Sequence, residues 1–531
     1  MSDIRTGSPP PDLYFLSDLH LSAGCSKESR RTSRLETFYY DYEFSNFVDR
    51  LIVESSLRQR ETIVILNGDI FDFLAVTKIP TPDEIEQLGI TLTRHEKKFG
   101  MESEPIKDAW KMRHIIRGHP EFMAALLRLA DAGVSVRLHR GNHDLELFWP
   151  EVQDAFYDEI AKLAYLERAP DVIPENLRRL ITFHDWFYHE PGRIWVEHGH
   201  QYEASNSLSY QLWPVLTTRS DKTPTLDLPT GSLFVRYVYN RMRIIDPYST
   251  QVFSLEKYLD IISTSNALEL AKALFVHFPF FTRALKRARI FELGGMGGSA
   301  AKHRQRLAQM SEESGLGDNL GRIDALRRFP IGVTKYTLFR QMMRPIVRNF
   351  VGLIVVFLAS IGGWMLLFSL IQNTHWLAGS VLGKASLMAV LAVATIVGLF
   401  AASTWFSRRY GRVKDTLNED LVAHAEAISR ILDVRLIVFG HSHGVDRRLL
   451  SNGHTLYGNS GTWIAVRGAW DQLRPFGRQF TFLRVRDDDI EALRWNDWAA
   501  RIEPVTLFEH YEPTVIEKLI GEGTKTRDEK P

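Results

Sequence analysis

The sequence contains almost no cysteine, and its charges nearly cancel. Cys25 is the only cysteine among 531 residues, which excludes an intramolecular disulfide framework and a metal site built on several thiolates. The formal net charge is +1, so the chain lacks the overall positive field that nucleic-acid binding usually requires. Nucleic acid is therefore not an expected partner, and any argument from charge has to be local.

The sequence also lacks a recognisable secretory signal and an internal repeat. Its first residues, MSDIRTGSPPPDL, contain no basic segment leading into an apolar run, so we expect the chain to begin in the cytosol. Its length exceeds that of a comfortable single domain, which suggests a large domain with an insertion, or several units. With 45% hydrophobic residues, the chain has ample material for a core.

What the sequence does contain is a series of short apolar segments that each stop at a polar turn. Such segments suit strands buried on both faces, and stretches of helical periodicity, such as residues 120–133, lie between them. The pattern predicts an α/β fold with polar residues at the carboxyl ends of its strands, where open α/β sheets usually build their sites. Residues 454–466 and 478–495 predict further strands or hairpins. The five segments are LYFLSDLHL (13–21), TIVILNGDIFD (62–72), VSVRLHRGNHD (134–144), RIWVEHGH (193–200) and RLIVFGHSHG (435–444).

The interval from about residue 201 to 430 has a different composition. It holds helical stretches with Arg and Lys, followed by two 22-residue runs without a charge, 350–371 and 385–406. At 1.5 Å rise per residue each run reaches roughly 33 Å, enough to cross a hydrocarbon core of about 30 Å. We therefore predict an integral membrane protein with two spans, with a buried helical hairpin as the alternative. Basic residues flank the outer ends of the pair, which places the α/β domain and both termini in the cytoplasm.

The polar residues at the predicted strand ends are types that bind divalent metal ions. They supply carboxylate, imidazole and amide groups, a set that suits Mn, Fe, Co, Ni or Zn. Sharing them between two ions requires one bridging carboxylate, and two ions about 3.5 to 4 Å apart can clamp a phosphoryl group. Gly68, Gly141, Gly199 and Gly440 each adjoin such a residue, where a sharp turn or close backbone approach is needed. The polar residues are Asp18, His20, Asp69, Asp72, Asn142, His143, Asp144, His198, His441 and His443.

The ordered series D-x-H, G-D-x-x-D, G-N-H-D, H-G-H and G-H-x-H resembles the calcineurin-like metallophosphoesterases. The resemblance covers about residues 10–200 and 430–500. It implies a metallophosphoesterase-type αββα sandwich in two parts, 1–200 and 431–531, with a helical insertion over 201–430 that carries the two spans. Within the family, DLHLS and the order of the motifs look closest to the UDP-2,3-diacylglucosamine hydrolases, although His143 stands where that branch typically carries Arg.

The resemblance also implies a role for each matching residue. His143 would stabilise the phosphoryl oxygens or protonate the leaving group, and Asp72 would orient it, while a hydroxide that bridges the two metals attacks phosphorus. Manganese is the first expectation for both ions, with Fe, Zn, Co or Ni as alternatives. Asp144 is expected to hold its turn rather than a metal. The implied ligands are Asp18, His20, Asp69 and His443 for one ion, and Asp69, Asn142, His198 and His441 for the other.

The function implied is that of a membrane-anchored phosphoesterase that hydrolyses a phosphoester or pyrophosphate bond. The alternatives are a cyclic-nucleotide phosphodiesterase or nuclease of the same family, and a non-catalytic scaffold. Because the two apolar runs lie between His198 and His441, the site would be tethered to a bilayer, which favours an amphipathic, lipid-linked or nucleotide-linked substrate. Guanidinium groups after the first motif could hold a second phosphate, with a solvated basic loop as the alternative. The candidate substrate-binding residues are Arg30, Arg31, Arg34, Tyr202 and Asn206.

Overall fold

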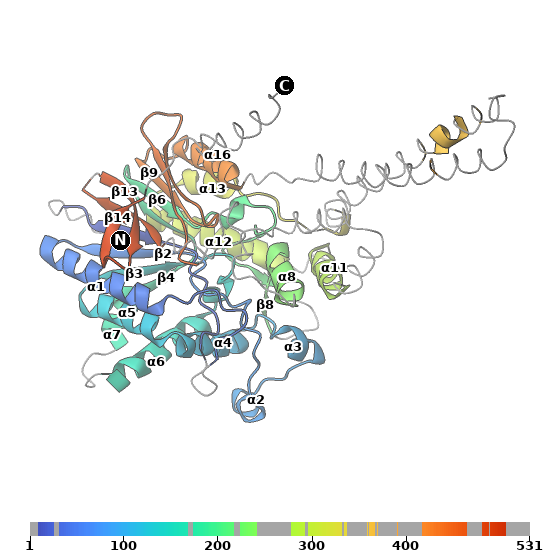
Figure 1. Cartoon of the computed structure of the whole chain (residues 1–531), viewed down its shortest axis with the longest axis horizontal. Helices are drawn as coiled ribbons and strands as arrows, with labels where there is room; N and C mark the ends of the chain where they lie inside the picture. The colour runs from blue at the N-terminus through green and yellow to red at the C-terminus, as the bar shows by residue number, and fades with distance from the viewer. Residues whose placement is uncertain are drawn as a thin grey trace, which may run out of the picture.

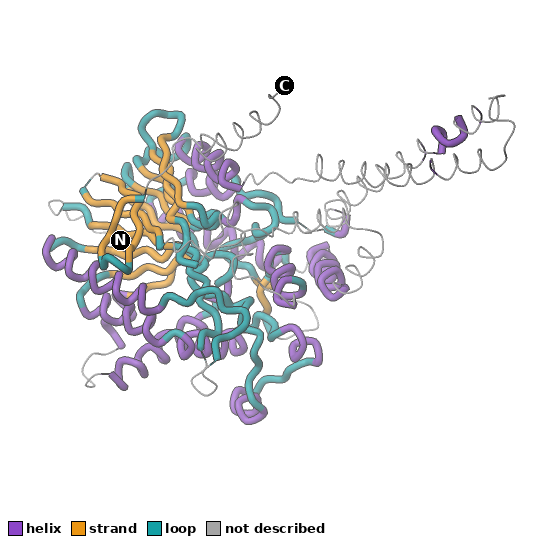
Figure 2. Tube along the Cα trace, in the orientation of Figure 1, coloured by secondary structure: helices purple, strands orange, loops and turns teal. Residues whose placement is uncertain are grey.

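The chain has a mixed α/β fold with parallel and antiparallel strands, as the sequence predicts. In the computed structural model the strands gather together and helices lie on both sides of them (Figure 1, Figure 2). The structure describes residues 9–25, 31–167, 174–216, 223–241, 278–292, 296–331, 334–336, 358, 361–366, 369, 390, 417–464, 480–487 and 489–505.

The first sheet has seven strands in the order β14-β13-β12-β1-β2-β3-β4. The four strands β1 to β4 are parallel, whereas β12 pairs antiparallel with β1 and continues into β13 and β14. The three predicted segments of the N-terminal part thus form the middle of this sheet. The strands are β1 (Asp12–Leu16), β2 (Thr62–Asn67), β3 (Ser135–His139), β4 (Ile181–His184), β12 (Thr481–Arg486), β13 (Asp489–Asn496) and β14 (Arg501–Pro504).

The second sheet has five strands in the order β10-β11-β9-β6-β5. Its middle strands β11, β9 and β6 are parallel, and the two outer strands pair antiparallel with their neighbours. The remaining two predicted segments supply β6 and β9. The strands are β5 (Phe187–Glu190), β6 (Ile194–Glu197), β9 (Leu436–Phe439), β10 (Val445–Leu449) and β11 (Leu456–Ser460), and a separate pair is formed by β7 (Val215–Leu216) and β8 (Thr225–Leu226).

Several helices, α5 among them, place their apolar residues on one buried face. In α5, Phe122, Met123, Leu126 and Leu129 recur three to four residues apart, and all are buried in the same core cluster. The helices are α1 (Asp41–Arg58), α2 (Pro82–Leu88), α3 (Arg94–Phe99), α4 (Pro105–Gly118), α5 (Pro120–Asp131), α6 (Pro150–Glu167), α7 (Pro174–Leu180), α8 (Thr230–Tyr237), α11 (Phe278–Glu292), α12 (Gly297–Ser314), α13 (Asp318–Asp324) and α16 (Leu417–Ser429), with short 3-10 turns η1 (Leu145–Phe148), η2 (His200–Tyr202) and η3 (Tyr239–Arg241).

Strand β1 shows why the predicted strands are apolar without interruption. Successive side chains of a strand point to opposite faces. Leu13 belongs to a buried cluster that contains residues of both sheets, among them Val438 of β9, whereas Leu16 belongs to the cluster under α1, α4, α5 and α6. Because both faces are covered, both sets of positions must be apolar. A third cluster joins the second sheet to α13 and α16, through residues such as Leu320 and Leu421.

The prediction of two membrane-spanning helices is corrected by the structure. Among the residues described, no helix is long and apolar enough to cross a bilayer. Of the runs 350–371 and 385–406, only residues 358, 361–366, 369 and 390 are described, and 361–366 covers roughly 9 Å of a core about 30 Å thick. The rest of both runs lies outside the described residues. The assignment as an integral membrane protein with its catalytic domain and termini in the cytoplasm is therefore withdrawn.

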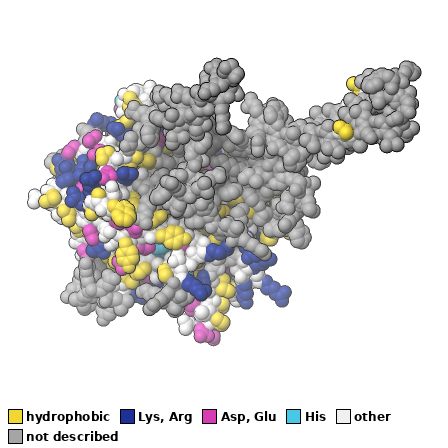
Figure 3. Space-filling model, in the orientation of Figure 1, with side chains coloured by type: hydrophobic (Ala, Val, Ile, Leu, Met, Phe, Trp, Pro, Cys, Tyr) yellow, Lys and Arg dark blue, Asp and Glu magenta, His cyan; other side chains and the backbone are white. Residues whose placement is uncertain are grey.

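Acidic and basic side chains are mixed on the described part of the surface. At the left of Figure 3, Lys and Arg side chains lie beside Asp and Glu side chains. Arg58 illustrates this arrangement, because its Nη2 lies 3.3 Å from Asp487 Oδ2 on the exposed surface. Such exposed pairs contribute little stability. The mixture agrees with a net charge of +1.

A buried histidine fixes the loop that follows β1. His119 Nε2 lies 3.2 Å from Glu36 Oε2, and its Nδ1 lies 3.0 Å from Asp41 Oδ1. Glu36 also accepts hydrogen bonds from Ser22 Oγ at 2.7 Å and from the backbone N of Gly24 at 2.6 Å. Burial alone would lower the pKa of His119, but the two carboxylates raise it to about 10. The imidazolium therefore holds the loop to α4 and α1.

We expect His119→Gln to lower the free energy of unfolding at neutral pH by about 3 kcal/mol or more, because Glu36 loses a buried cation. Stabilisation from a raised pKa is complete below the unfolded value, about 6.5, and is lost as the pH rises through the folded value, about 10. Urea unfolding of both proteins from about pH 6 to about pH 10.5 checks this. The difference between them should shrink at the highest pH, and a constant difference would contradict the expectation.

Candidate metal centre

The loops after five strands meet where the carboxyl ends of the two sheets come together. His20 donates its backbone N to Asp69 O at 2.9 Å, which joins the loops after β1 and β2. Gly440 donates its backbone N to His198 O at 3.0 Å, which joins the loops after β9 and β6. The two sheets are then linked by the backbone N of His441, which donates to Asp18 Oδ2 at 3.0 Å. The backbone N of His143, in the loop after β3, donates to Asp69 Oδ1 at 2.8 Å, so residues from five separate stretches of chain are brought together.

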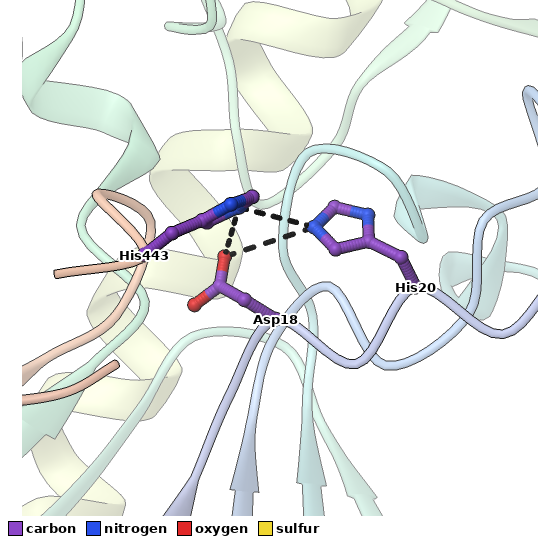
Figure 4. A group of neighbouring side chains, drawn as sticks. All are labelled: Asp18, His20 and His443. Carbon is purple, nitrogen blue, oxygen red and sulfur yellow. Dashed lines mark hydrogen bonds and ion pairs between the residues drawn. The ribbon is translucent and has the colours of Figure 1, made fainter. Parts of the chain in front are cut away.

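Asp18, His20 and His443 form the first group of side chains that could hold a metal ion. Figure 4 shows that the three point toward one another from two separate loops. Asp18 Oδ1 lies 3.2 Å from His443 Nε2, and the Nε2 atoms of His20 and His443 are also 3.2 Å apart. All three side chains are buried. Two imidazoles and a carboxylate that converge in this way are suitable ligands for a divalent cation.

Asp69, His198 and His441 form the second group, and Asp69 also belongs to a third group with His20 and His143. His198 Nδ1 donates to the carbonyl oxygen of Asn67 at 2.8 Å. In a neutral ring this leaves the lone pair on Nε2, which lies 3.3 Å from Asp69 Oδ2. Burial lowers the pKa of His198, but the neighbouring Asp69 carboxylate raises it to about 9. A metal ion bound at this group would take the place of the proton on His198 Nε2, which the Asp69 carboxylate stabilises.

Several buried polar atoms at these groups support a fit to metal ions. Among the described residues, Asn142 Oδ1 is buried and forms no hydrogen bond, and the buried His198 Nε2 has only its ion contact with Asp69 Oδ2. Buried polar atoms are almost always paired, and an ion is one recognised explanation for an exception. Carboxylate, imidazole and amide donors are also the chemical set that borderline divalent ions accept. The residues therefore fit one or more divalent metal ions.

The backbone is strained at five of the predicted ligands. Asp18, His20, Asp69, His441 and His443 all have φ between 54° and 67°. Among the described residues, only four other non-glycine residues have positive φ. Left-handed backbone at a non-glycine residue costs on the order of 1 to 3 kcal/mol, and such residues cluster at functional sites. The strain indicates a site that the surrounding fold holds in place.

Two of the four predicted glycines show why no side chain fits beside the ligands. A Cβ atom on Gly141 would lie 2.2 Å from Asp69 Oδ1 and 2.5 Å from its backbone N. A Cβ atom on Gly440 would lie 2.6 Å from Ser17 Oγ and 2.9 Å from Asp18 Oδ2. The close backbone approach that the sequence predicts is therefore present at both positions.

His143 lies at the edge of these groups, with its side chain 16% exposed. Its Nδ1 lies 3.2 Å from Asp72 Oδ2. Burial lowers the pKa of His143, but the carboxylates of Asp72 and Asp69 raise it to about 10. Burial raises the pKa of Asp72, but His143 and His20 lower it well below its usual range. The pair can hold a proton close to the metal-ligand groups.

Asp144 holds the turn of its motif, as expected from the sequence. Its Oδ1 accepts a hydrogen bond from the backbone N of Gly141 at 2.6 Å, and its Oδ2 accepts one from Ile70 N at 2.8 Å. Asp144 is fully buried. It thereby ties the loop after β3 to the loop after β2.

The structure describes two of the three predicted substrate-binding arginines, Arg31 and Arg34. Arg30 lies outside the described residues. Arg31 is exposed. Arg34 donates its Nη2 to the backbone oxygen of Asn240 in η3 at 2.9 Å, so it contacts the segment after β8. These observations do not test whether the arginine side chains bind a second phosphate, so that remains a prediction.

The assignment of Tyr202 as a substrate-binding residue is corrected by the structure. Its ring is only 1% exposed and stacks on the ring of His424, with centroids 4.4 Å apart. Its hydroxyl donates to Glu197 Oε1 at 2.7 Å. A 3-10 turn places successive side chains about 120° apart, so residues close to His198 in sequence point in different directions. Tyr202 therefore belongs to the core of the second sheet.

Two further residues support the site and were not identified from the sequence. Asn67 accepts the hydrogen bond from His198, and its Nδ2 donates to the backbone oxygen of Glu197 at 2.9 Å. Glu203 Oε2 lies 2.7 Å from His441 Nε2. Asn206, a predicted substrate-binding residue, instead donates its Nδ2 to Glu203 Oε2 at 2.7 Å. The only available signal was their position next to a motif, which does not specify a partner.

The resemblance to metallophosphoesterases receives no independent support from known proteins. The chain matches no model of a known protein family, and no curated protein matches it. The resemblance therefore rests on the five motifs alone.

Proposed function

We propose that this protein is a metal-dependent phosphoesterase that hydrolyses a phosphoester or pyrophosphate bond. The observation that carries the proposal is the convergence of five motif loops on buried Asp and His groups, with Asp69 in two of them. One of these groups contains His20, a ligand implied for the first ion, and the other contains His198 and His441, implied for the second, so Asp69 is suited to bridge two ions. The motif order of the calcineurin-like metallophosphoesterases supplies the reaction class.

Two divalent ions, with manganese as the first expectation, would occupy this centre. Asp18, His20 and His443 would hold one ion, and Asn142, His198 and His441 the other, with Asp69 shared. When bound, the ions supply Lewis-acid stabilisation of phosphoryl oxygens and a water of lowered pKa.

In this proposal His143 acts on the substrate directly. Its protonated ring donates a hydrogen bond to a phosphoryl oxygen or a proton to the leaving-group oxygen. Asp72, 3.2 Å from His143 Nδ1, orients the ring and keeps its proton available. The exposed edge of His143 is consistent with contact to a substrate that arrives from solvent.

The metallophosphoesterase-type αββα sandwich is part of the same proposal. The buried cluster shared by the two sheets supports it, as do the helix clusters on the outer faces of both sheets. The argument for a lipid-linked substrate depended on two membrane spans, so it is no longer part of the proposal. The substrate class proposed is a phosphoester or pyrophosphate.

His143→Ala tests the proposed function. The wild-type protein loaded with Mn²⁺ should hydrolyse bis(p-nitrophenyl) phosphate or a nucleotide-sugar pyrophosphate, and EDTA should remove the activity. Loss of a general acid costs about 100- to 10,000-fold in rate, so we expect a decrease of that size in kcat. Metal content, measured by plasma emission spectroscopy, should stay close to that of the wild type.

His454→Ala is the matched control, because His454 is an exposed histidine whose Nε2 contacts only a surface carboxylate, Asp433 Oδ1 at 3.3 Å, among the interactions described. Its hydrolysis rate should equal that of the wild type. Unchanged turnover in His143→Ala, or a wild-type protein that binds no Mn²⁺, would contradict the proposed function.

A further inference from the structure

Glu203 lies directly against one of the predicted metal ligands. Its Oε2 is 2.7 Å from His441 Nε2, and its side chain is 21% exposed. A carboxylate only accepts hydrogen bonds when ionised, so His441 Nε2 must carry the proton in this contact. In a neutral imidazole the lone pair then lies on Nδ1. Glu203 therefore determines which ring nitrogen of His441 can bind a metal ion.

The position of Glu203 is itself fixed from several sides. Asn206 Nδ2 donates to Glu203 Oε2 at 2.7 Å, and Ser205 Oγ donates to Glu203 Oε1 at 2.5 Å. Asn206 is held in turn by the start of α8, where a Cβ atom on Gly231 would lie only 2.2 Å from Asn206 Oδ1. Gly231 also donates its backbone N to Ser205 O at 2.8 Å. The carboxylate is thus part of a packed layer and not a mobile surface group.

One short turn supplies both His198 and Glu203. Strand β6 ends at Glu197, Gly199 has a φ of 98°, and η2 follows directly. This turn lets His198 contribute a ring nitrogen to the group with Asp69 while Glu203, five residues later, reaches His441 from the other side. Both histidines of the group then have one nitrogen occupied by a protein oxygen, Asn67 O for His198 and Glu203 Oε2 for His441.

We propose that Glu203 is a positioning residue that orients His441 for metal binding, with Ser205 and Asn206 holding its carboxylate. This inference rests on the proposed function, because it requires a metal ion at the group formed by Asp69, His198 and His441. Loss of such a partner typically lowers metal affinity by about 10- to 100-fold. The group formed by Asp18, His20 and His443 has no contact with Glu203 among the interactions described.

The inference is tested by titrating metal-free protein with Mn²⁺ alone and measuring the heat of binding by calorimetry. Wild-type protein should bind two ions. Glu203→Ala should lower the affinity for one Mn²⁺ ion by about 10- to 100-fold and leave the affinity for the other unchanged. Glu203→Gln keeps the side-chain length and an oxygen that can accept from His441 Nε2, so its affinity should lie between those of wild type and Glu203→Ala. This partial rescue is not expected from a residue that only fills space.

Asp324→Asn is the matched control. Asp324 Oδ2 lies 3.3 Å from His303 Nε2, so it forms a carboxylate–imidazole pair on α13 and α12 that does not include a predicted ligand. Its variant should bind Mn²⁺ as the wild type does.

The inference would be overturned if both Glu203 variants kept the wild-type affinities, or if a folded variant lost affinity equally for both Mn²⁺ ions. If Glu203→Ala does not fold, Glu203→Gln alone decides between these outcomes. A wild-type protein that binds no Mn²⁺ would instead overturn the proposed function, and this inference with it.

Discussion

Replacing Asp69 with asparagine is expected to lower metal-dependent phosphodiester hydrolysis by about 1,000-fold or more, since loss of several kcal/mol of metal-derived stabilisation corresponds to that factor. Asp69 is grouped with His20, a proposed ligand of one ion, and with His198 and His441, proposed ligands of the other, so the proposal needs its charge at both ions. Its Oδ1 accepts a hydrogen bond from the backbone N of His143 at 2.8 Å, and an asparagine side-chain oxygen can keep that hydrogen bond. Asparagine also tolerates the φ of 54° at this position. The fold should therefore survive while bound Mn²⁺ is lost.

Asp487→Asn provides a control with the same backbone conformation. Asp487 also has a φ of 54°, but it lies on the surface beside Arg58. Its variant should retain both Mn²⁺ content, measured by plasma emission spectroscopy, and the hydrolysis rate. If Asp69→Asn kept wild-type metal content and turnover, Asp69 would not be a shared ligand, and the proposed function would lose its main support.

Gly141→Ala should damage the same centre without changing any ligand. The new methyl group would lie 2.2 Å from Asp69 Oδ1, so either Asp69 or the loop after β3 must move. Forced overpacking of this kind typically costs about 1 to 3 kcal/mol of stability. A displacement of about 1 Å at a catalytic centre can lower the rate by about 100-fold, which is the decrease we expect in hydrolysis. Thermal unfolding and the hydrolysis assay measure the two effects separately.

Gly321→Ala is the control for Gly141→Ala. Gly321 lies inside α13, and a Cβ atom there would meet no atom within 4 Å. Alanine is a better helix former than glycine by roughly 0.5 to 1 kcal/mol, so stability should rise slightly and activity should not change. Wild-type stability and activity in Gly141→Ala would show that the loop after β3 can relax, contrary to the tight packing described above.

The parts of the site that could be predicted are those encoded locally. Asp18, Asp69 and Asn142 each follow an apolar strand within a few residues, and parallel strands bring their carboxyl ends to one edge of a sheet. The α/β fold and the convergence of the motif residues were therefore accessible from the sequence. Continuous apolar segments also indicated that both faces of the sheets are covered.

The parts that could not be predicted depend on contacts between distant residues. Glu203 meets His441 across 238 positions, and Glu36 meets His119 across 83. The local sequence around a glutamate is the same whether its side chain is exposed to solvent or hydrogen-bonded to a distant histidine. Tyr202 was misassigned because closeness in sequence was taken as closeness in space, whereas η2 turns its ring into the core. Apolarity over 22 residues likewise predicted two spans that the described residues do not support.

The distance along the chain between the two halves of the centre has a consequence for biosynthesis. His20 and His443 are 423 positions apart, and β9 lies between β6 and β11 in the second sheet. At about 5 to 20 residues per second, a ribosome needs roughly 20 to 85 s to add the second histidine after the first. Until then β6 lacks its neighbour on one side, and an unpaired strand edge can attract other chains. In the proposed function, the metal ions would therefore be acquired late, after synthesis through residue 443, and pairing of β9 with β6 would cover the unpaired strand edge.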